Sequence, residues 1–366
     1  MNLDLSETQE LLRTTVRGFL ERELPFERVR ELERPEAEGR HDEVLWKELG
    51  RQGWLGLGLS EARGGADASL VDVGLLVEEL ARRAAIVPAL EAILVARVLD
   101  RHASAAVADE WVARILAGEA VVVPALFESG STDRAPAVEV DSDGRIRGEK
   151  AFVDYAQGAG HHLVSAHGRD GVGLHLVDAR VAGVTQEALR SIGRTPLAAV
   201  RYEGVPAQRV AGAEALDEML SLGRALAAIQ CVGSMAQALE MTVAYACVRE
   251  QFGKPIGSFQ AVRHHAANMA MQVASSRSLA FEALFALDSG WESAAELVAT
   301  AKASASRAAP WVLMLGHQIH GGNGVIEEND LYFFTLRGKD RSLAWGTADE
   351  CLEVLAESAG SPAEFL

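Results

Sequence analysis

Cysteine and positive charge are both scarce in this chain of 366 residues. It has three cysteines, Cys231, Cys247 and Cys351, and none of them forms a C-x-x-C pair. Their odd number and irregular spacing suggest neither a disulfide framework nor a zinc site, so we expect reduced, buried thiols. The formal net charge of −17 argues against nucleic acid or an anionic membrane as a partner, because both require clustered Lys and Arg.

Long apolar runs and targeting signals are also lacking. No uninterrupted apolar run reaches about 18 residues, so we expect no transmembrane helix. The first residues, M-N-L-D, carry neither a basic nor an apolar region. We therefore expect no signal peptide and a cytoplasmic location. No internal repeat or low-complexity segment interrupts the chain.

The residues that are abundant favour helix. Hydrophobic residues make up 49% of the chain and aromatic residues only 6%, and alanine is frequent. Alanine loses little conformational freedom on entering a helix, which makes long helices the natural product of such a composition. The length allows two or three domains at about 100–200 residues each.

Hydrophobic spacing divides the chain into three blocks, 1–117, 118–211 and 212–366. The first is helical, with a capping box at Ser6 and a helix that starts at Pro88. The second has short β-branched runs separated by turns such as D-S-D-G at 141–144, which predict a small barrel or sandwich. The third has long amphipathic runs, which predict a helical bundle. The fold class expected is thus α+β, mainly α, with a helical N-terminal domain, a middle β-barrel domain and a C-terminal four-helix bundle.

One motif stands where two long predicted helices meet. Residues 249–260 read R-E-Q-F-G-K-P-I-G-S-F-Q. An arginine can hold a pyrophosphate through two hydrogen bonds, and a phenylalanine at a turn can press against a nucleotide ring. Gly253 and Pro255 would also make a turn that binds nothing.

A second motif follows about 70 residues later, where residues 318–324 read Q-I-H-G-G-N-G. Glycines at this point let a phosphate or an adenine approach the backbone closely. Most glycine pairs of this kind are ordinary helix C-caps, so the match draws its weight from its distance of about 70 residues from the first motif.

These two motifs resemble those of the acyl-CoA dehydrogenase family. W-K-E-L-G-R-Q-G-W at 46–54, the glycines at 64–65 and V-E-E-L at 77–80 also resemble the family, so the resemblance spans nearly the whole chain. It implies FAD, an acyl-CoA ligand, an electron-transfer flavoprotein as electron acceptor and a tetramer. The residues implied to contact FAD are Arg249, Gln251, Phe252, Gln318, Gly321, Gly322, Phe152, Val153 and Thr347.

The family's catalytic base is missing from both positions where the family places it. The reaction removes a proton from Cα of the acyl thioester, and this hydrogen is so weakly acidic that a carboxylate must take it. Most members place a Glu before a Gly-Thr, where this chain has Trp345. A minority place it 26 residues before the motif arginine, where this chain has Gly223. Glu218 is the candidate for an alternative base, with other acids nearby, Asp217, Asp349 and Glu350. Solvated acids at helix ends, which the helix dipole favours, are the simpler explanation of these residues.

The middle domain departs from the family as well. The family's T-E-P-x-A-G-S-D appears as the shorter F-E-S-G-S-T-D at 127–133. Its K-x-W-I-T strand appears as K-A-F-V-D at 150–154, in which Phe152 can still stack on a flavin. Asp154 replaces a hydroxyl, and a carboxylate there would disfavour an anionic reduced flavin.

The losses share a pattern. The resemblance implies that Arg249, Phe252 and the Gln318 motif reach the flavin of a neighbouring subunit, and these are kept. The residues that would serve the chain's own flavin and substrate are lost or altered. We therefore expect a supporting subunit of a heterotetramer, with a homologous catalytic partner, as in actinobacterial steroid side-chain breakdown. An active homotetramer with an unfamiliar base and a non-redox binding or scaffold protein are the alternatives.

A metal site is not expected. His317 and His320 are three residues apart on a predicted helix and could face the same way, but no third ligand lies near them in the sequence.

Overall fold

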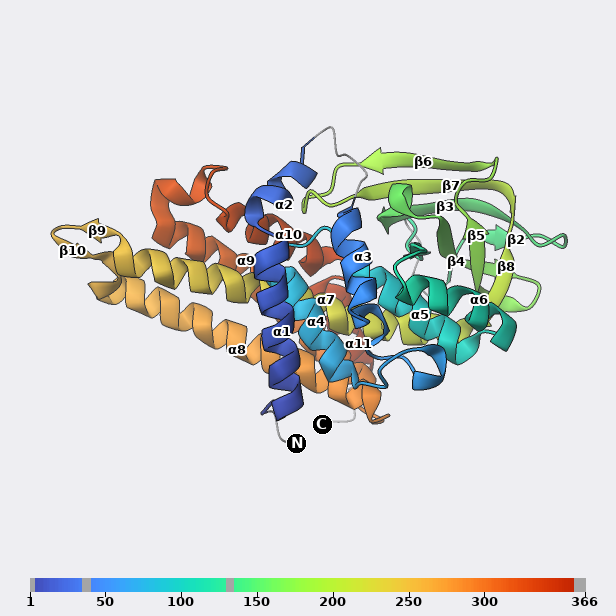
Figure 1. Ribbon diagram of the computed structural model, residues 1–366, viewed down its shortest axis with the longest axis horizontal. Coiled ribbons are helices and arrows are strands. Elements are labelled where there is room, and N and C mark those ends of the chain that lie inside the picture. Colours follow the sequence, from blue (N-terminus) through green and yellow to red (C-terminus); the bar gives the residue numbers. More distant parts are fainter. Residues whose placement is uncertain (1–3, 35–40, 130–134, 359–366) are drawn as a thin grey trace. The chain divides into compact units, whose positions relative to one another are not determined.

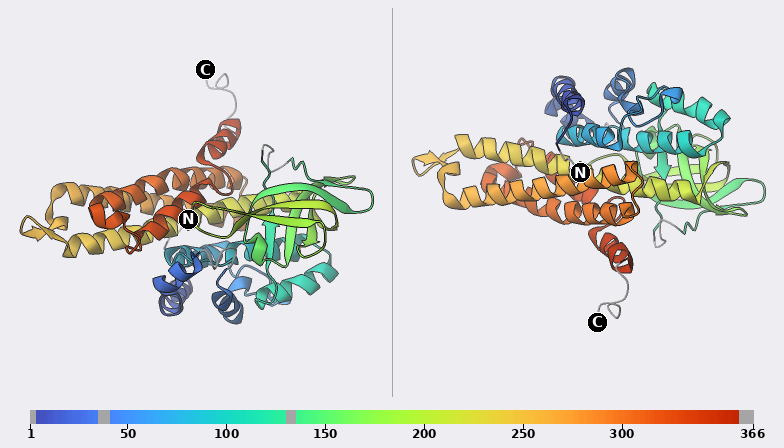
Figure 2. Two further views of the ribbon diagram at one scale, coloured as in Figure 1. Left: turned by 90° about the horizontal axis from the view of Figure 1, so that it is seen from above. Right: turned by 90° about the horizontal axis from the view of Figure 1, so that it is seen from below.

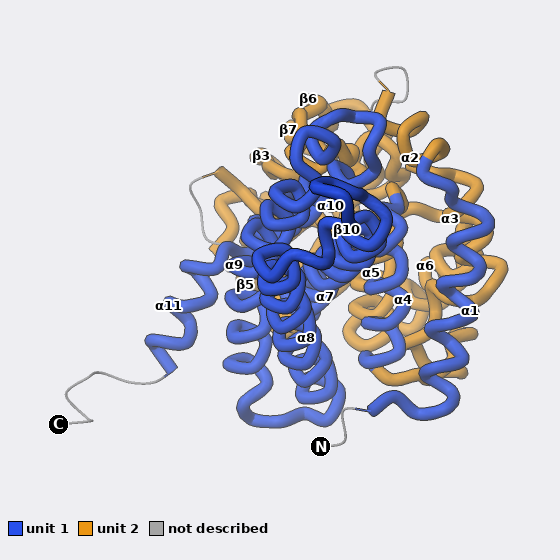
Figure 3. Tube along the Cα trace, turned by 90° about the vertical axis from the view of Figure 1, so that its left-hand side faces the viewer, with its two compact units in different colours: residues 1–26, 70–85, 222–366 blue, residues 27–69, 86–221 orange. Residues whose placement is uncertain are grey.

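A computed structural model describes residues 4–34, 41–129 and 135–358 of the chain. Helices come first and last in the sequence and strands lie between them (Figures 1 and 2), so the expected fold class is confirmed. The chain forms two compact units (Figure 3). The first unit contains Met1–Phe26, Leu70–Ala85 and Leu222–Leu366, and the second contains Glu27–Ser69 and Ile86–Ser221. The expected three-domain division stays a prediction.

The N-terminal helices begin and end where local chemistry predicts. Ser6 Oγ accepts a hydrogen bond from the Gln9 amide and Gln9 Oε1 accepts one from the Ser6 amide, which completes the expected capping box. Pro88 is the N-cap of α5, as expected. These helices are α1 (Glu7–Glu23), α2 (Phe26–Leu32), α3 (Glu43–Arg51), α4 (Leu70–Arg82), α5 (Ala89–His102) and α6 (Ala105–Leu116).

The strands form one mixed sheet in the second unit. The order along the sheet is β6-β7-β3-β2-β4-β5-β8, and β1 pairs with β4 in parallel. Helices α5 and α6 run along one side of the strands (Figure 2). The strands are β1 (Val122–Ala125), β2 (Glu139–Val140), β3 (Arg145–Asp154), β4 (His161–Gly168), β5 (Gly171–Asp178), β6 (Val184–Leu189), β7 (Leu197–Pro206) and β8 (Gln208–Gly212).

A buried polar pair lies inside this sheet. The Tyr202 hydroxyl on β7 lies 3.0 Å from Nδ1 of His162 on β4, and both side chains are buried. Burial holds the pKa of His162 at about 4, because a charged imidazole would lose its hydration there. The native protein therefore holds this histidine neutral.

The C-terminal helices pack around α9. They are α7 (Ala213–Val248), α8 (Gln260–Asp288), α9 (Ala294–His320), α10 (Leu331–Leu343) and α11 (Ala348–Ser358). Helices α8, α10 and α11 each pack against α9. A short hairpin, β9 (Glu250–Gln251) and β10 (Lys254–Pro255), projects from the ends of α7 and α8 (Figure 1).

Helix α7 is long and apolar enough to cross a membrane by length and composition alone, unlike any other helix of the described residues. Within its most apolar window, 78% of the residues are buried inside the protein, as in the core helix of a globular domain. The thiols differ in part from expectation, because Cys231 and Cys351 are buried but Cys247 is exposed near the end of α7.

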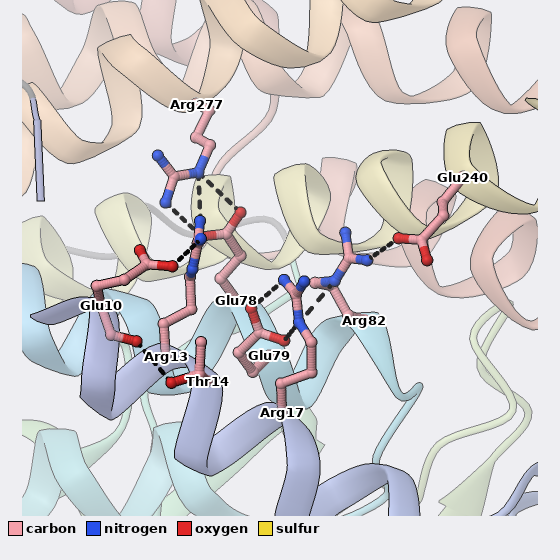
Figure 4. A network of polar contacts seen from close by, with 9 residues as sticks. All are labelled: Glu10, Arg13, Thr14, Arg17, Glu78, Glu79, Arg82, Glu240 and Arg277. Atoms are coloured by element: carbon pink, nitrogen blue, oxygen red, sulfur yellow. Dashed lines mark hydrogen bonds and ion pairs between the residues drawn. The ribbon is translucent and has the colours of Figure 1, made fainter.

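Helix α4 is held in the first unit by buried acids (Figure 4). Glu79 accepts hydrogen bonds from Nε and Nη2 of Arg17 on α1, at 2.9 and 2.7 Å, and is 1% exposed. Glu78 accepts three hydrogen bonds from Arg277 on α8. Arg82 pairs with Glu240 on α7. Four helices are thus joined through one turn of α4.

Removal of the Glu79 carboxylate is expected to destabilise the protein strongly. Glu79→Ala leaves Arg17 and Arg82 without this buried partner, which costs about 3 kcal/mol of unfolding free energy. Urea denaturation measures the loss. Glu23→Ala, which removes an exposed ion pair with Arg22 on α1, is the control and should change stability by under about 1 kcal/mol. Equal effects of the two substitutions would contradict the role of Glu79.

The buried His162 predicts a loss of stability in mild acid. Between pH 6.5 and about 4 the unfolded chain binds a proton at this residue and the folded chain does not, so stability falls as pH falls through this range. The full effect is about 3 kcal/mol. His162→Gln keeps an acceptor for Tyr202 and should flatten this part of the pH profile of urea unfolding. An unchanged profile would contradict the assignment of this loss of stability to His162.

Candidate functional site

The residues of the first motif are presented at the tip between α7 and α8. Arg249, Gln251 and Phe252 are all exposed, and Phe252 is exposed by 93%. Its φ of +54° lies in the left-handed region, which a non-glycine residue adopts at an energetic cost. Gly253 follows with φ +78°, so the turn directs the phenyl ring outward, and the ring touches Phe259 edge-on.

The second motif reaches the same end of the first unit. The Tyr245 ring, one turn before Arg249 on α7, stacks on the His320 ring at the end of α9, with centroids 4.3 Å apart. Gln318 is exposed, and a Cβ at Gly321 or Gly322 would meet no atom within 4 Å. The structure therefore brings the two motifs together and leaves the glycine backbone open to a ligand.

His320 carries an unused hydrogen-bonding atom at this junction. Its Nδ1 accepts a hydrogen bond from the amide group of Asn329 at 3.2 Å, so Nε2 carries the ring proton. That Nε2 is buried and has no hydrogen-bond partner among the described residues. In the sequence, His320 stands out as a possible metal ligand, and nothing singles out Tyr245. The contact between their rings depends on how α7 and α9 pack, which no local pattern encodes.

The two histidines are not gathered with other metal ligands. His317 Nε2 lies 2.6 Å from the Thr335 hydroxyl, and His320 stacks on Tyr245. Among residues 4–34, 41–129 and 135–358, no group of three or more His, Cys, Asp or Glu side chains is placed to hold a metal ion.

Trp345 and Gly223, the two positions without the expected Glu, lie against each other. A Cβ built on Gly223 would be 2.2 Å from Cε3 and 2.4 Å from Cζ3 of Trp345. The indole ring therefore covers the backbone of α7 at Gly223 and is 5% exposed. Neither side chain can remove a proton from a substrate.

Thr347 caps a helix. Its hydroxyl lies 3.0 Å from Glu350 Oε2 and accepts a hydrogen bond from the Glu350 amide at 3.3 Å. The Thr347 amide donates to the same carboxylate at 2.6 Å. Thr347 and Glu350 therefore form a capping box at the start of α11. This pairing gives Glu350 a structural role, and Asp349 beside it is exposed.

Phe152 stands on a bulge of β3. The pairing of β3 with β7 shifts between Lys150 and Val153, and both of these side chains are buried. Two residues lie between them instead of one, so Phe152 has φ +55° and is 58% exposed. Asp154 is half-buried.

Lys150 anchors the same strand from inside the second unit. Its ammonium group is fully buried, pairs with Glu128 and donates to Ser165 Oγ at 3.0 Å and Leu126 O at 3.1 Å. Burial lowers the pKa of Lys150 to about 8 against the opposing effect of Glu128. Glu128 survives from the shortened segment 127–133, of which Gly130 to Asp133 lie outside the described residues.

Glu218 is surrounded by hydrogen-bonding partners from α5. Its carboxylate accepts from Arg97 Nε at 2.9 Å and Arg101 Nε at 3.2 Å, and lies 2.7 Å from Nε2 of His102. Burial would raise the pKa of Glu218, but the hydrogen bond to His102 and the two arginines outweigh burial and lower it. A carboxylate so stabilised in its charged form is a weak base, and its geometry fits a clasp between α5 and α7.

Two family models match this chain. "Acyl-CoA dehydrogenase, N-terminal domain" matches residues 6–119 and "Acyl-CoA dehydrogenase, C-terminal domain" matches residues 211–360. Acyl-CoA dehydrogenase FadE27 of Mycobacterium tuberculosis is 28% identical, over 92% of this chain and 93% of that protein. A solved steroid ACAD variant, Tcur3481–Tcur3483, is 33% identical with a TM-score of 0.90, over 97% of this chain and 99% of that chain. The chain belongs to the acyl-CoA dehydrogenase family.

Another solved relative is a complex of two differently named subunits. The ChsE4–ChsE5 complex from Mycobacterium tuberculosis contains a chain 28% identical to this one, with a TM-score of 0.90, over 99% of this chain and 100% of that one. The family consists of oxidoreductases that bind FAD. The matches along its length therefore place this chain among the oxidoreductases of the acyl-CoA dehydrogenase family.

Several groups at the end of the first unit are of the kinds that bind a nucleotide cofactor. Arg249 offers an exposed guanidinium group, Phe252 an exposed ring, and Gly321 and Gly322 an open backbone. Nε2–H of His320 lacks an acceptor within the described part of the chain. These groups fit an anionic, aromatic ligand, and FAD is such a ligand.

The substitution Glu218→Gln distinguishes a structural role of Glu218, which joins α5 and α7, from a role as the catalytic base. The amide cannot neutralise Arg97 and Arg101, so unfolding free energy should fall by about 1–2 kcal/mol at pH 7. Because the native pKa of Glu218 is lowered, this difference from the wild type should shrink as pH falls through that pKa. Flavin reduction by acyl-CoA in the assembled enzyme should change less than about twofold; a loss of about 100-fold or more would instead identify Glu218 as the base.

Proposed function

We propose that this chain is the supporting subunit of an FAD-dependent acyl-CoA dehydrogenase that desaturates an acyl-CoA thioester between Cα and Cβ. It lacks its own base and contributes to a flavin site shared with a homologous catalytic subunit. The observation that carries the proposal is the contact between Trp345 and Gly223, since both positions for the base are occupied by groups that accept no proton.

In this proposal, each of the residues that match the family motifs contacts a different part of FAD. Arg249 binds the pyrophosphate of FAD, Phe252 lies against its ring system, and Gly321 and Gly322 let the cofactor approach the backbone. FAD, when bound, supplies the acceptor for the hydride from Cβ. The proton from Cα goes to a carboxylate of the partner subunit, because this chain offers none at the family positions.

The surface around the two motifs also suits a second protein chain. Several large apolar side chains are exposed on the elements that carry the motifs: Val248, Phe252, Met314, Val325 and Ile326. Exposed apolar groups of this kind on one end of a unit favour burial in an interface. The arrangement of the relative named ChsE4–ChsE5 supports a heteromeric assembly over a homotetramer. An electron-transfer flavoprotein is the electron acceptor that we infer, and a lipid or steroid acyl-CoA the substrate.

The decisive experiment compares the chain alone with the chain co-expressed with any homologous subunit that is encoded beside it. We expect flavin absorbance near 450 nm and turnover of acyl-CoA with an artificial acceptor only for the co-expressed complex. Stoichiometric FAD and turnover in the chain alone would establish an active homo-oligomer instead. A well-folded pair without flavin would favour a scaffold protein.

Variants of the first motif test its contribution to the shared site. Arg249→Ala and Phe252→Ala in the complex should each weaken FAD binding by about 10–100-fold, the size expected for a lost charged hydrogen bond or a lost ring contact. Titration of the apo-complex with FAD measures this change. Phe285→Ala removes an exposed ring from α8 and is the control, expected to leave the FAD affinity unchanged. Unchanged affinity in all three variants would contradict the assignment.

A further inference from the structure

The Trp345 ring occupies a space that only glycine on α7 leaves open. The six-membered half of the indole lies so close to Gly223 that Cδ2, Cε3 and Cζ3 would be 2.2–2.8 Å from a Cβ at that position. Real Cβ atoms essentially never make contacts this short. The ring can therefore lie here only because residue 223 is glycine, and any side chain at that position would require the packing to change.

The backbone at Trp345 is held in place from two sides. Its φ of +61° is the left-handed conformation, unusual for a bulky residue, and Gly346 follows with φ +108°. Arg224 Nε donates to the Trp345 carbonyl oxygen at 3.1 Å, and Thr347 is fixed by its capping box with Glu350. A strained conformation that its surroundings determine so fully is typical of a functional position.

A buried lysine fixes the helix that leads into this residue. Lys302 on α9 is fully buried and donates to the carbonyl oxygens of Arg341 and Ser342 at 3.2 and 3.1 Å, and to Ser306 Oγ at 2.8 Å. These hydrogen bonds thus cap carbonyl groups at the C-terminal end of α10, two residues before Ala344. This cap fixes the end of α10 and with it the backbone that leads into Trp345, which restricts the position of the indole ring.

The geometry points to a latent apolar site at Gly223 that the Trp345 ring fills, so that this chain takes no acyl group at the position of the missing base. Without the ring, the space would accept a small planar or apolar molecule such as indole. The link to acyl-CoA rests on the proposed function, whereas the filled site itself rests only on the contacts of Gly223 and Trp345.

A double-mutant cycle tests the contact on the full-length chain. Gly223→Ala should lower Tm by about 5 °C or more, because its Cβ would collide with the ring. In the Trp345→Ala background the same change should raise Tm, because alanine favours helix over glycine and the collision is gone. Gly18→Ala on α1, where a Cβ meets nothing within 4 Å, is the control and should have the same small effect in both backgrounds. If Gly223→Ala is equally destabilising in both backgrounds, the proposed contact is wrong.

Binding of indole tests the site. Added indole should raise the Tm of Trp345→Ala by a few degrees and leave the wild type unchanged, because an apolar cavity takes up a molecule that matches it. Trp311→Ala, which removes a half-exposed ring from α9, should show no such rise. A Trp345→Ala protein that folds but does not respond to indole would overturn the latent site, since the space would then have collapsed.

If the Trp345→Ala protein does not fold, a less disruptive substitution can take its place in the double-mutant cycle. Trp345→Leu keeps part of the apolar filling and should still make Gly223→Ala less harmful than in the wild type. None of these measurements requires FAD or a partner, so the latent site and the proposed function can fail independently. Turnover by the chain alone would disprove the supporting role. An equal effect of Gly223→Ala on Tm in the presence and absence of the Trp345 ring would disprove the filled site.

Discussion

The first unit depends on the close approach of α4 to its neighbours. A Cβ at Gly233 on α7 would be 2.5 Å from the Glu78 carbonyl oxygen, and one at Gly74 on α4 would be 2.5 Å from Leu284 on α8. At this separation the acids of α4 are out of water and must be paired. Arg17 and Arg277 meet that need, so the same turn that brings the helices together also joins them by charge.

Left-handed backbone recurs at aromatic residues of this chain. Phe152, Tyr155, Phe252 and Trp345 all have positive φ, which costs a bulky residue conformational energy. Phe152 and Phe252 are exposed, whereas Tyr155 and Trp345 are buried. The same unusual backbone therefore presents a ring outward in two places and packs a ring inward in two others.

In the supporting role that we propose, a subunit has to retain a surface and can give up a pocket. The exposed end that carries Arg249, Phe252 and the open glycines would be that surface. The closed pair of Gly223 and Trp345 would be the pocket that packing has replaced. Glu218 shows the same tendency, because the acid nearest to the family's alternative base position is held as an ion by three partners.

The sequence by itself determined features that depend on neighbours in the chain. The capping box at Ser6, the helix that starts after Pro88, the order of helical and β segments and the family motifs are all local patterns with a local cause. Only the tertiary structure decided that Trp345 covers Gly223, that Tyr245 and His320 join the two motifs, and that Cys247 is exposed. Trp345 and Gly223 are more than 120 residues apart. No periodicity encodes such a contact, because it arises from how helices pack and from the glycine that lets a ring reach the backbone.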